Sequence, residues 1–388
     1  MVTTVKRVKA INTSRVMREI WMQRSISRVD ISKRTGLNKS TITHIVNELM
    51  EKGLVRRDSI GEASPQGGRR PIYLTLNEKF GCILGIELRP ESYSAVAVDL
   101  VGDITFSKSE RMKIAGSDIA DSYRDIIERL EIDCTRSGAP LLGVGVGLAG
   151  VVNPYKRTIK YSIPLKLDEQ YDFFTRISEK YPIPVFPEND ANCCALGELA
   201  FHREYGLKNF LFVLVEIRDV ADMQSIYEKT AVGMGIVIEG KLYHGTNYSA
   251  GEFRSVFRSS DNRGQVSLSD HEARVVDTDT AVTRKFIREL SKNIALLVNT
   301  FNLEIVFLGG DIEKYQSEVK EILTEEIRSN WSYPDPVDCE IKFSTLRERA
   351  VAYGAAGMVL DRLFTGIEPV EGVENIRFGG VDLIPGWH

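Results

Sequence analysis

The pattern of hydrophobic and polar positions near the start of the chain predicts three helices. Apolar residues recur at near-helical spacing over residues 11–24. Ser27 is a candidate N-cap for a second, short helix, which Gly36 ends because glycine readily takes the left-handed conformation. A third helix begins at Asn38 or Ser40. Its apolar residues are spaced to form one buried stripe: Ile42, Ile45, Val46, Leu49 and Met50.

The opposite face of the third helix is polar and suits base edges and phosphates. A strand, a Gly-rich basic turn over residues 65–71 and a returning strand follow, which completes a winged helix-turn-helix pattern. We therefore expect a DNA-binding domain over residues 1–78. The expected contacts are Arg28, Lys39, Ser40, Thr41, Thr43, His44 and Asn47 on the helices and Arg69 and Arg70 on the wing. A helical-hairpin protein-interaction domain with a basic linker is the alternative.

Beyond residue 78 the pattern changes to apolar strands that alternate with amphipathic helices. Alternation of this kind predicts α/β layers with ligand sites at the carboxyl ends of strands. Residues 141–152 form a Gly-rich apolar strand and turn, and residues 299–312 run from a helix through a strand into a Gly-Gly turn. No internal repeat is evident in the sequence, although two related α/β halves are compatible with it.

Charge separates the two parts of this 388-residue chain. Residues 1–75 hold 15 Lys and Arg against six Asp and Glu, a net charge of +9, and the remainder carries −13. A basic head on an acidic body is the electrostatic pattern of a nucleic-acid-binding module joined to another domain, although a solvated basic face is the simpler alternative.

The chain shows no signs of export or of a disulfide framework. No signal-peptide pattern or membrane-spanning run is present, so we expect a cytoplasmic protein without a membrane partner. The five cysteines are an odd number without CxxC spacing, which argues against disulfides and against a zinc cluster.

Several stretches in order resemble the ROK family of repressors and sugar kinases: GGRRP (67–71), GIELRPESYSAVAVD (85–99), GVGVGLAGVVNP (143–154), ENDANCCALGE (188–198), GKLYHGTNYSAGE (240–252), NTFNLEIVFLGGDI (299–312) and AYGAAG (352–357). A ROK chain with a winged helix in front is similar to the xylose- and N-acetylglucosamine-type repressors. The resemblance implies an actin-like, two-lobed sugar-kinase body. We expect a first lobe over residues 79–190, completed by a final helix at 349–365, a second lobe over 191–348, and a ligand cleft between them.

The departures from the family pattern argue against kinase activity. Arg89, Pro90 and Glu91 stand where the resemblance implies a Gly-Gly-Thr turn that cradles ATP phosphates, and proline removes an amide donor while glutamate adds repulsive charge. Residues 229–233 replace a second Gly-rich phosphate loop. Phosphoryl transfer depends on positioning those phosphates, so we expect no enzyme activity and no cofactor.

The metal site that the resemblance implies also lacks its ligands. The family His and cysteine cluster are replaced after Glu252, and Gln265 stands where a Cys is expected, so we predict no metal. Asn189, Asp190 and Glu252 remain as hydrogen-bonding groups for a sugar, with Gly150 facing the same cleft by resemblance and Arg254 as a replacement donor. An Asx-type cap of the following helix is the structural alternative for Asn189 and Asp190.

These observations predict a DNA-binding regulator, a repressor of carbohydrate genes, that binds double-stranded DNA as a homodimer or higher oligomer. A carbohydrate or polyol in the cleft is the expected effector. A sugar kinase that also regulates is the alternative, and a scaffold that recruits a partner through its body is a third hypothesis.

Overall fold

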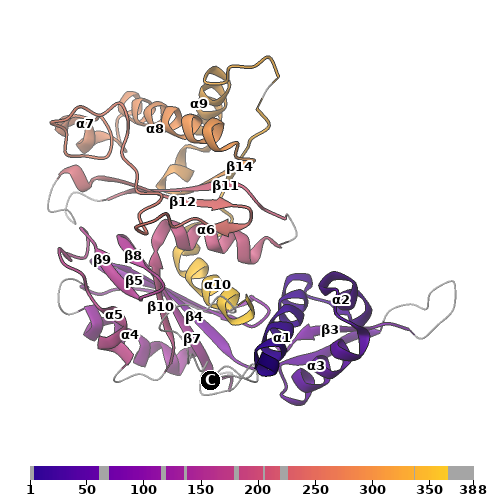
Figure 1. Ribbon diagram of the computed structural model, residues 1–388. Helices are drawn as coiled ribbons and strands as arrows, with labels where there is room; N and C mark the ends of the chain where they lie inside the picture. Colours follow the sequence, from indigo (N-terminus) through magenta and orange to yellow (C-terminus); the bar gives the residue numbers. More distant parts are fainter. Residues whose placement is uncertain are drawn as a thin grey trace. The chain divides into compact units, whose positions relative to one another are not determined.

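The computed structural model describes residues 4–60, 70–114, 119–134, 138–178, 183–203, 206–218, 226–335 and 337–365. Its contacts divide the chain into two compact units, one formed by residues 1–188 with 352–388 and the other by residues 189–351. The elements of each unit are shown in Figure 1. None of the helices in the described part combines the length and apolar character needed to cross a membrane.

The head at the start of the first unit is a winged helix-turn-helix. Its elements are α1 (Thr4–Gln23), β1 (Ile26–Ser27), α2 (Arg28–Thr35), α3 (Lys39–Glu51), β2 (Val55–Ile60) and β3 (Ile72–Leu76). The three strands form one antiparallel sheet in the order β1-β3-β2. Strands β2 and β3 are the two strands that the sequence predicts for the wing. Strand β1 is not predicted, because two residues are too few to show an alternating apolar pattern.

Local signals fix the ends of α2 and the start of α3 where the sequence places them, whereas α1 begins at Thr4, earlier than the stretch predicted from residue 11. The Ser27 hydroxyl accepts a hydrogen bond from the backbone N–H of Asp30 and caps α2, which ends at Gly36 with φ 69°. Asn38 caps α3 by accepting from the Thr41 backbone N–H at 2.8 Å. The predicted stripe on α3 is buried, except that Met50 is half-buried and lies against Arg28.

The body part of the first unit is built on a five-stranded sheet in the order β10-β7-β4-β5-β6. Its elements are β4 (Cys82–Arg89), β5 (Ser92–Asp99), β6 (Ile104–Arg111), α4 (Ile119–Cys134), β7 (Leu141–Leu148), β8 (Val151–Asn153), β9 (Thr158–Tyr161), α5 (Phe173–Ser178), β10 (Val185–Asn189) and α10 (Ala350–Thr365). Strands β4 and β7 are parallel, while β4, β5 and β6 form an antiparallel meander.

Helix α10 lies unusually close to the first sheet. A Cβ added at Gly85 on β4 would be 1.8 Å from the Ala352 carbonyl oxygen, and one at Gly145 on β7 would be 2.1 Å from that of Ala355. Only glycine therefore permits this approach. The result is that a helix from the end of the described chain completes the core of a sheet formed near its start.

The second unit repeats the strand arrangement of the first. Its elements are α6 (Asp190–Phe201), β11 (Phe210–Ile217), η5 (Ile226–Glu228), β12 (Thr230–Ile238), β13 (Lys241–Leu242), α7 (Asp270–Val275), α8 (Thr280–Phe301), β14 (Ile305–Gly310), η6 (Asp311–Tyr315), α9 (Gln316–Ser329), β15 (Glu340–Phe343) and η7 (Arg347–Arg349). The sheet order is β13-β12-β11-β14-β15, with an antiparallel meander followed by parallel strands. The sequence was compatible with two related α/β halves, and the sheets of the two units have the same strand order, with an antiparallel meander beside a parallel strand in each.

Candidate nucleic-acid interface and ligand site

The polar face of α3 is presented to solvent. Lys39, Ser40, Thr43, His44 and Asn47 are exposed. Thr41 is half-buried, and its backbone N–H is held by the Asn38 cap. The stripe of buried residues on the other side fixes the rotation of α3, so these five side chains form one accessible surface, which we call the α3 face.

Some groups of the α3 face have intramolecular partners. The Thr43 hydroxyl donates to the Lys39 carbonyl oxygen at 2.8 Å, and the Ser40 hydroxyl donates to Asn38 Oδ1 at 2.8 Å. Asn47 Oδ1 accepts from Arg28 Nη2 at 3.2 Å. Hydroxyl oxygens retain acceptor capacity and the amide retains its NH₂ group, so each can still bind a further partner.

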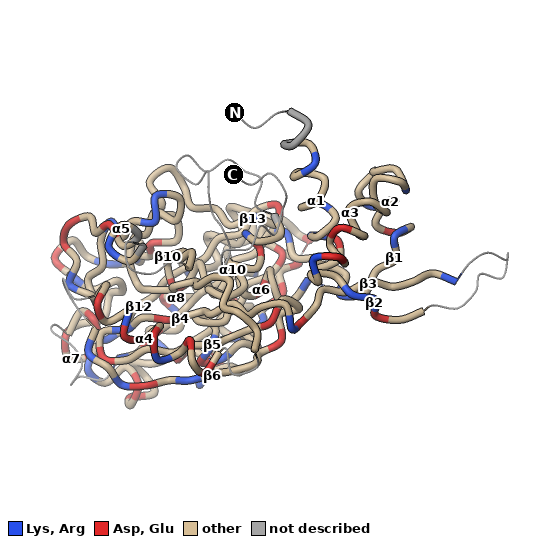
Figure 2. The backbone as a smooth tube through the Cα atoms, turned by 90° about the horizontal axis from the view of Figure 1, so that it is seen from below, with Lys and Arg blue, Asp and Glu red and all other residues tan. Residues whose placement is uncertain are grey.

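The wing also carries arginine residues (Figure 2). Arg56 on β2 pairs with Glu78, with Nε to Oε2 at 2.8 Å, whereas Arg57 is exposed and has no ion-pair partner among the described residues. Arg70 is exposed where the description of the chain resumes, and Arg69 lies outside the described residues. Sequence reasoning did not single out Arg57. Its signal is its place in the short basic strand that follows α3.

The predicted ligand residues divide between the two units. Gly150 lies in the first unit between β7 and β8, with φ 146° and no room for a Cβ beside the Tyr161 carbonyl oxygen. Asn189, Asp190, Glu252 and Arg254 belong to the second unit.

Asn189 and Asp190 form the N-terminal cap of α6. Asn189 Oδ1 accepts from the Asn192 backbone N–H at 3.1 Å, and Asp190 Oδ1 accepts from the Ala191 backbone N–H at 2.8 Å. Both side chains are half-buried. The capping role that the sequence offered as an alternative is therefore present, and it leaves the remaining carboxylate and amide atoms at the amino end of a helix, where anionic and hydrogen-bonding groups are stabilised.

Strand β12 brings Asp190 and Glu252 to one place. A Cβ built on Gly233 would lie 3.8 Å from Asp190 Oδ1, and Gly233 forms an isolated β-bridge with Glu252. Gly251 approaches β12 so closely that a Cβ there would lie 1.8 Å from the Met234 carbonyl oxygen. Although the Glu252 side chain reaches solvent, desolvation of its carboxyl raises its pKa. The Asp190 carboxylate and the backbone of Glu252 thus both lie beside Gly233, and we call Asp190 and Glu252 the carboxylate cluster.

Arg254 is exposed and makes no ion pair or hydrogen bond with Glu252 or with any other described residue. The expected role as a replacement donor therefore depends on a bound ligand, and it stays a prediction.

In the turns that replace the expected phosphate loops, polar groups already have hydrogen-bond partners within the chain. Arg89 Nε donates to Glu87 Oε1 at 2.7 Å, and the carbonyl oxygens of Pro90 and Glu91 accept backbone hydrogen bonds from Ile114 and Met112. A buried carboxylate and carbonyl oxygens that accept backbone hydrogen bonds are unlike the amide donors that bind phosphate.

The second replaced loop lies at the start of β12. Lys229 is buried and pairs with Asp277, Nζ to Oδ2 at 2.9 Å. The Val232 backbone N–H donates to Gln265 Oε1 at 2.7 Å. The same Gln265 side chain donates from Nε2 to the carbonyl oxygens of Val232 and Phe253. A backbone amide in this loop is therefore already satisfied within the chain.

Side-chain amides hold the loop in which the family resemblance implies a metal. Asn262 Nδ2 donates to the carbonyl oxygens of Val266 and Leu268, and Gln265 bridges to β12. Within the described ranges no group of three or more His, Cys, Asp and Glu side chains is placed to hold a metal ion. All five cysteines are free thiols.

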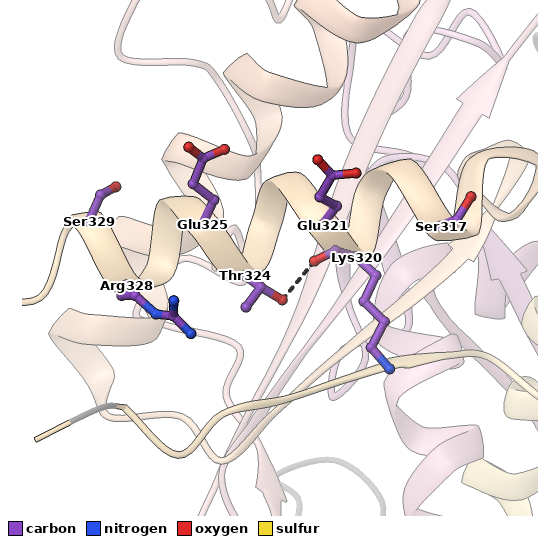
Figure 3. Close-up of a pocket in the computed structure, with 7 residues that line it drawn as sticks. All are labelled: Ser317, Lys320, Glu321, Thr324, Glu325, Arg328 and Ser329. Carbon is purple, nitrogen blue, oxygen red and sulfur yellow. Dashed lines mark hydrogen bonds between the residues drawn. The ribbon is translucent and has the colours of Figure 1, made fainter.

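A hollow of about 530 Å³ lies along the outer face of α9 (Figure 3). It is lined by Ser317, Lys320, Glu321, Thr324, Glu325, Arg328 and Ser329. All seven come from one solvent-facing helix, and none belongs to the α3 face or the carboxylate cluster. We assign no function to this hollow.

Comparison with known proteins covers both parts of the chain. Residues 84–254 match the ROK family, and residues 12–60 match the MarR family. The xylose repressor of Bacillus subtilis (strain 168) is 27% identical over 385 residues, which cover 91% of this chain and 96% of that protein. The xylose repressor of Caldicellulosiruptor bescii is 26% identical over 405 residues, covering 92% and 97%.

The solved structures that share the fold include a transcriptional regulator and a sugar kinase. A ROK family transcriptional regulator, a homolog of the E. coli MLC protein, aligns with a TM-score of 0.72 and 22% identity over 94% of this chain and 100% of that chain. A ROK family glucokinase from Streptomyces griseus, solved with glucose and AMPPNP, aligns with a TM-score of 0.55 and 17% identity, over 72% and 99%. The predicted architecture, a helix-turn-helix followed by a sugar-kinase-like body, is confirmed.

Proposed function

This chain carries a ROK-family domain behind a helix-turn-helix head, and from that premise we propose that it is a carbohydrate-responsive, DNA-binding transcriptional repressor. One observation carries the proposal: the similarity to xylose repressors extends over 91% of this chain and therefore includes head and body together. A repressor of this kind acts on DNA in the cytoplasm.

The head, residues 1–78, is the DNA-binding domain of the proposal. The α3 face offers hydroxyl, amide, imidazole and ammonium groups to base edges and phosphates. Arg57 and Arg70 of the wing supply charge for phosphates. A dimer or higher oligomer is proposed because half-sites one helical turn apart need two reading heads.

The carboxylate cluster is the proposed effector site. Asp190 and Glu252 are acceptors for vicinal hydroxyls, and Asn189 supplies both a donor and an acceptor. Arg254 of the same unit completes the set that we propose to contact the effector, and the expected contact of Gly150 stays a prediction. Since two of the similar proteins are named xylose repressors, xylose is the first sugar to test.

We propose that the protein is not a sugar kinase. The Arg89–Glu87 pair and the engaged Val232 amide support this proposal, because phosphate cradles need unpaired backbone donors and small residues. ATP turnover in the presence of a sugar that binds would overturn it and favour a bifunctional kinase.

Helix α10 offers a route from the body to the head within the first unit. Phe186 lies on β10, which leads directly into Asn189 and Asp190, and the Arg362 guanidinium lies 4.9 Å from the centre of its ring. Two residues further along α10, Phe364 contacts Trp21 of α1. We propose that effector binding at the start of α6 changes the position of β10 and α10, and through Trp21 that of the head.

Two assays test the function. Selection of duplexes from a random-sequence DNA pool by the full chain is expected to enrich one sequence, with affinity that falls steeply as salt rises. A thermal-shift screen with xylose, other sugars and polyols is expected to find a stabilising ligand that weakens binding to the enriched duplex. Failure to enrich any sequence would refute DNA recognition, and a regulator without a small-molecule effector would give enrichment but no thermal shift.

A further inference from the structure

The Arg28 side chain contacts residues of α3 and forms no ion pair with a carboxylate of the described residues. Its Nη2 donates to Asn47 Oδ1 at 3.2 Å and lies 3.6 Å from Met50 Sδ. Its Nε is buried and has no hydrogen-bond partner among the described residues. Burial of the guanidinium, and next the nearby Arg57, lowers the pKa of Arg28. A cation placed against α3 in this way contributes to the position of the α3 side chains.

The contact with Arg28 determines how the Asn47 amide is presented. An unrestrained asparagine amide can rotate by 180° and exchange its oxygen with its NH₂ group. A guanidinium carries only donors, so it holds the oxygen and leaves the NH₂ group for another partner. Asn47 is exposed on the α3 face. Its NH₂ group is then a fixed donor for an acceptor on a base edge, of which the purine N7 is present on both adenine and guanine.

Arg57 is the contrasting cation of the same surface. It is exposed on β2 and has no ion-pair or hydrogen-bond partner for its guanidinium among the described residues. An accessible cation of this kind suits a backbone phosphate, which contributes affinity without sequence information. The two arginines therefore have separable effects on binding.

We infer that Arg28 is a positioning residue for sequence specificity: it orients the Asn47 amide so that its NH₂ group reads an acceptor on one base pair of the major groove. The inference rests on the proposed DNA-binding function and assigns a role within its interface. It differs from a direct phosphate contact because Arg28 acts on DNA through Asn47.

The experiment uses the full chain, the duplex that wild type enriches from a random pool, and a scrambled duplex of the same composition. Arg28→Lys keeps the positive charge but loses the guanidinium geometry. We expect it to reduce the ratio of specific to scrambled affinity by about tenfold, in the range of one base contact, while the slope of log K against log salt stays unchanged. A repeated selection with Arg28→Lys is expected to relax one base position.

The variants Asn47→Ala and Asn47→Asp test whether Arg28 acts on DNA through Asn47. Asn47→Asp keeps acceptors for Arg28 but removes the NH₂ group, so it is expected to relax the same base position as Arg28→Lys. The double variant Arg28→Lys with Asn47→Ala is expected to lose no more specificity than Asn47→Ala alone. As the contrasting control, Arg57→Ala is expected to weaken both duplexes equally and to lower the salt slope by about 0.9.

Three outcomes would overturn the inference. One is an unchanged base preference in Arg28→Lys, and another is relaxation at a position different from that of Asn47→Asp. The third is an Arg28→Ala variant that behaves like Arg57→Ala, which would make Arg28 a phosphate contact. If wild type itself enriches no sequence, the proposed function fails and the inference falls with it, so the two failures are distinguishable.

Discussion

Trp21 of α1 packs against Phe364 of α10, with ring centroids 5.4 Å apart and ring planes inclined by 41°. Both side chains are almost completely buried. The contact joins the DNA-binding head to the helix that completes the first sheet of the body. It is the contact through which we propose that a change in the body reaches α1.

The first prediction concerns this pair. Trp21→Ala and Phe364→Ala are each expected to lower the free energy of unfolding by about 3–5 kcal/mol, because each leaves a large cavity. The double variant is expected to lose less than the sum, with a coupling of about 0.5–1.5 kcal/mol for an aromatic pair. Urea unfolding of wild type, the two single variants and the double variant gives the free energies from which this coupling is calculated.

The milder variant Trp21→Leu tests regulation. It is expected to retain binding to the selected duplex while the effector changes that binding less than in wild type. An undiminished effector response in a folded Trp21→Leu protein would contradict the route through α10.

Asp190→Asn is expected to weaken the effector by roughly 10- to 100-fold, because it removes charge-assisted hydrogen bonds worth about 1.5–3 kcal/mol. Affinity for the selected duplex without effector should stay unchanged, since the head is untouched. Calorimetric titration with the sugar found by thermal shift measures the first effect. Asp261→Asn is the control, because Asp261 is an exposed carboxylate of the same unit outside the carboxylate cluster. Wild-type affinity in Asp190→Asn would refute the site.

Arg56 and Arg57 are neighbouring arginines with different partners, which makes them a matched pair. Arg57→Ala is expected to reduce the salt slope of DNA binding by about 0.9, as one lost phosphate contact. Arg56→Ala is expected to change the slope less, because Arg56 pairs with Glu78. Binding measured between about 50 and 200 mM salt gives both slopes. Equal slopes for the two variants would contradict the assignment.

Glu198 on α6 makes stability depend on pH. Its carboxyl is fully buried, accepts from the Ser344 hydroxyl at 2.9 Å, and lies 3.3 Å from His202 Nε2. Burial raises the pKa of Glu198 to about 7. The folded state therefore holds a proton that the unfolded state loses near its ordinary pKa of 4.5.

The sign follows from that difference. The contribution of Glu198 to stability is largest below pH 4.5 and declines as pH rises to about 7, above which it stays constant. Glu198→Gln is expected to remove this decline, which is roughly 3 kcal/mol at most. Urea unfolding at a series of pH values measures it, with Glu325→Gln on the exposed face of α9 as control. A pH dependence unchanged by Glu198→Gln would show that the carboxyl does not titrate in this window.

Gln265 is expected to contribute to stability through its three hydrogen bonds to β12 and Phe253. Gln265→Ala should lower the free energy of unfolding by roughly 1–3 kcal/mol, because partly buried backbone groups lose their partners. Gln316→Ala, at an exposed glutamine at the start of α9, is the control. Thermal unfolding of both variants measures this effect, and equal midpoints would contradict a stabilising role for Gln265.

The sequence by itself determined the elements that depend on local chemistry. The caps at Ser27 and Asn38, the stop at Gly36 and the stripe on α3 are interactions between residues a few positions apart, so their spacing is visible in the chain. The same holds for the strand–turn–helix that places Asn189 at the N-cap of α6. Family resemblance added the order of strands and helices.

Only the tertiary structure decided which distant residues meet. Gly233 and Glu252 are joined by a bridge that depends on how the loop after β13 returns to β12, and Asn47 is held by a residue from another helix. Trp21 and Phe364 lie at opposite ends of the chain and meet because α10 packs through Gly85 and Gly145. Contacts of this kind depend on the packing of whole helices and strands, so the periodicity of apolar residues in the sequence does not predict them.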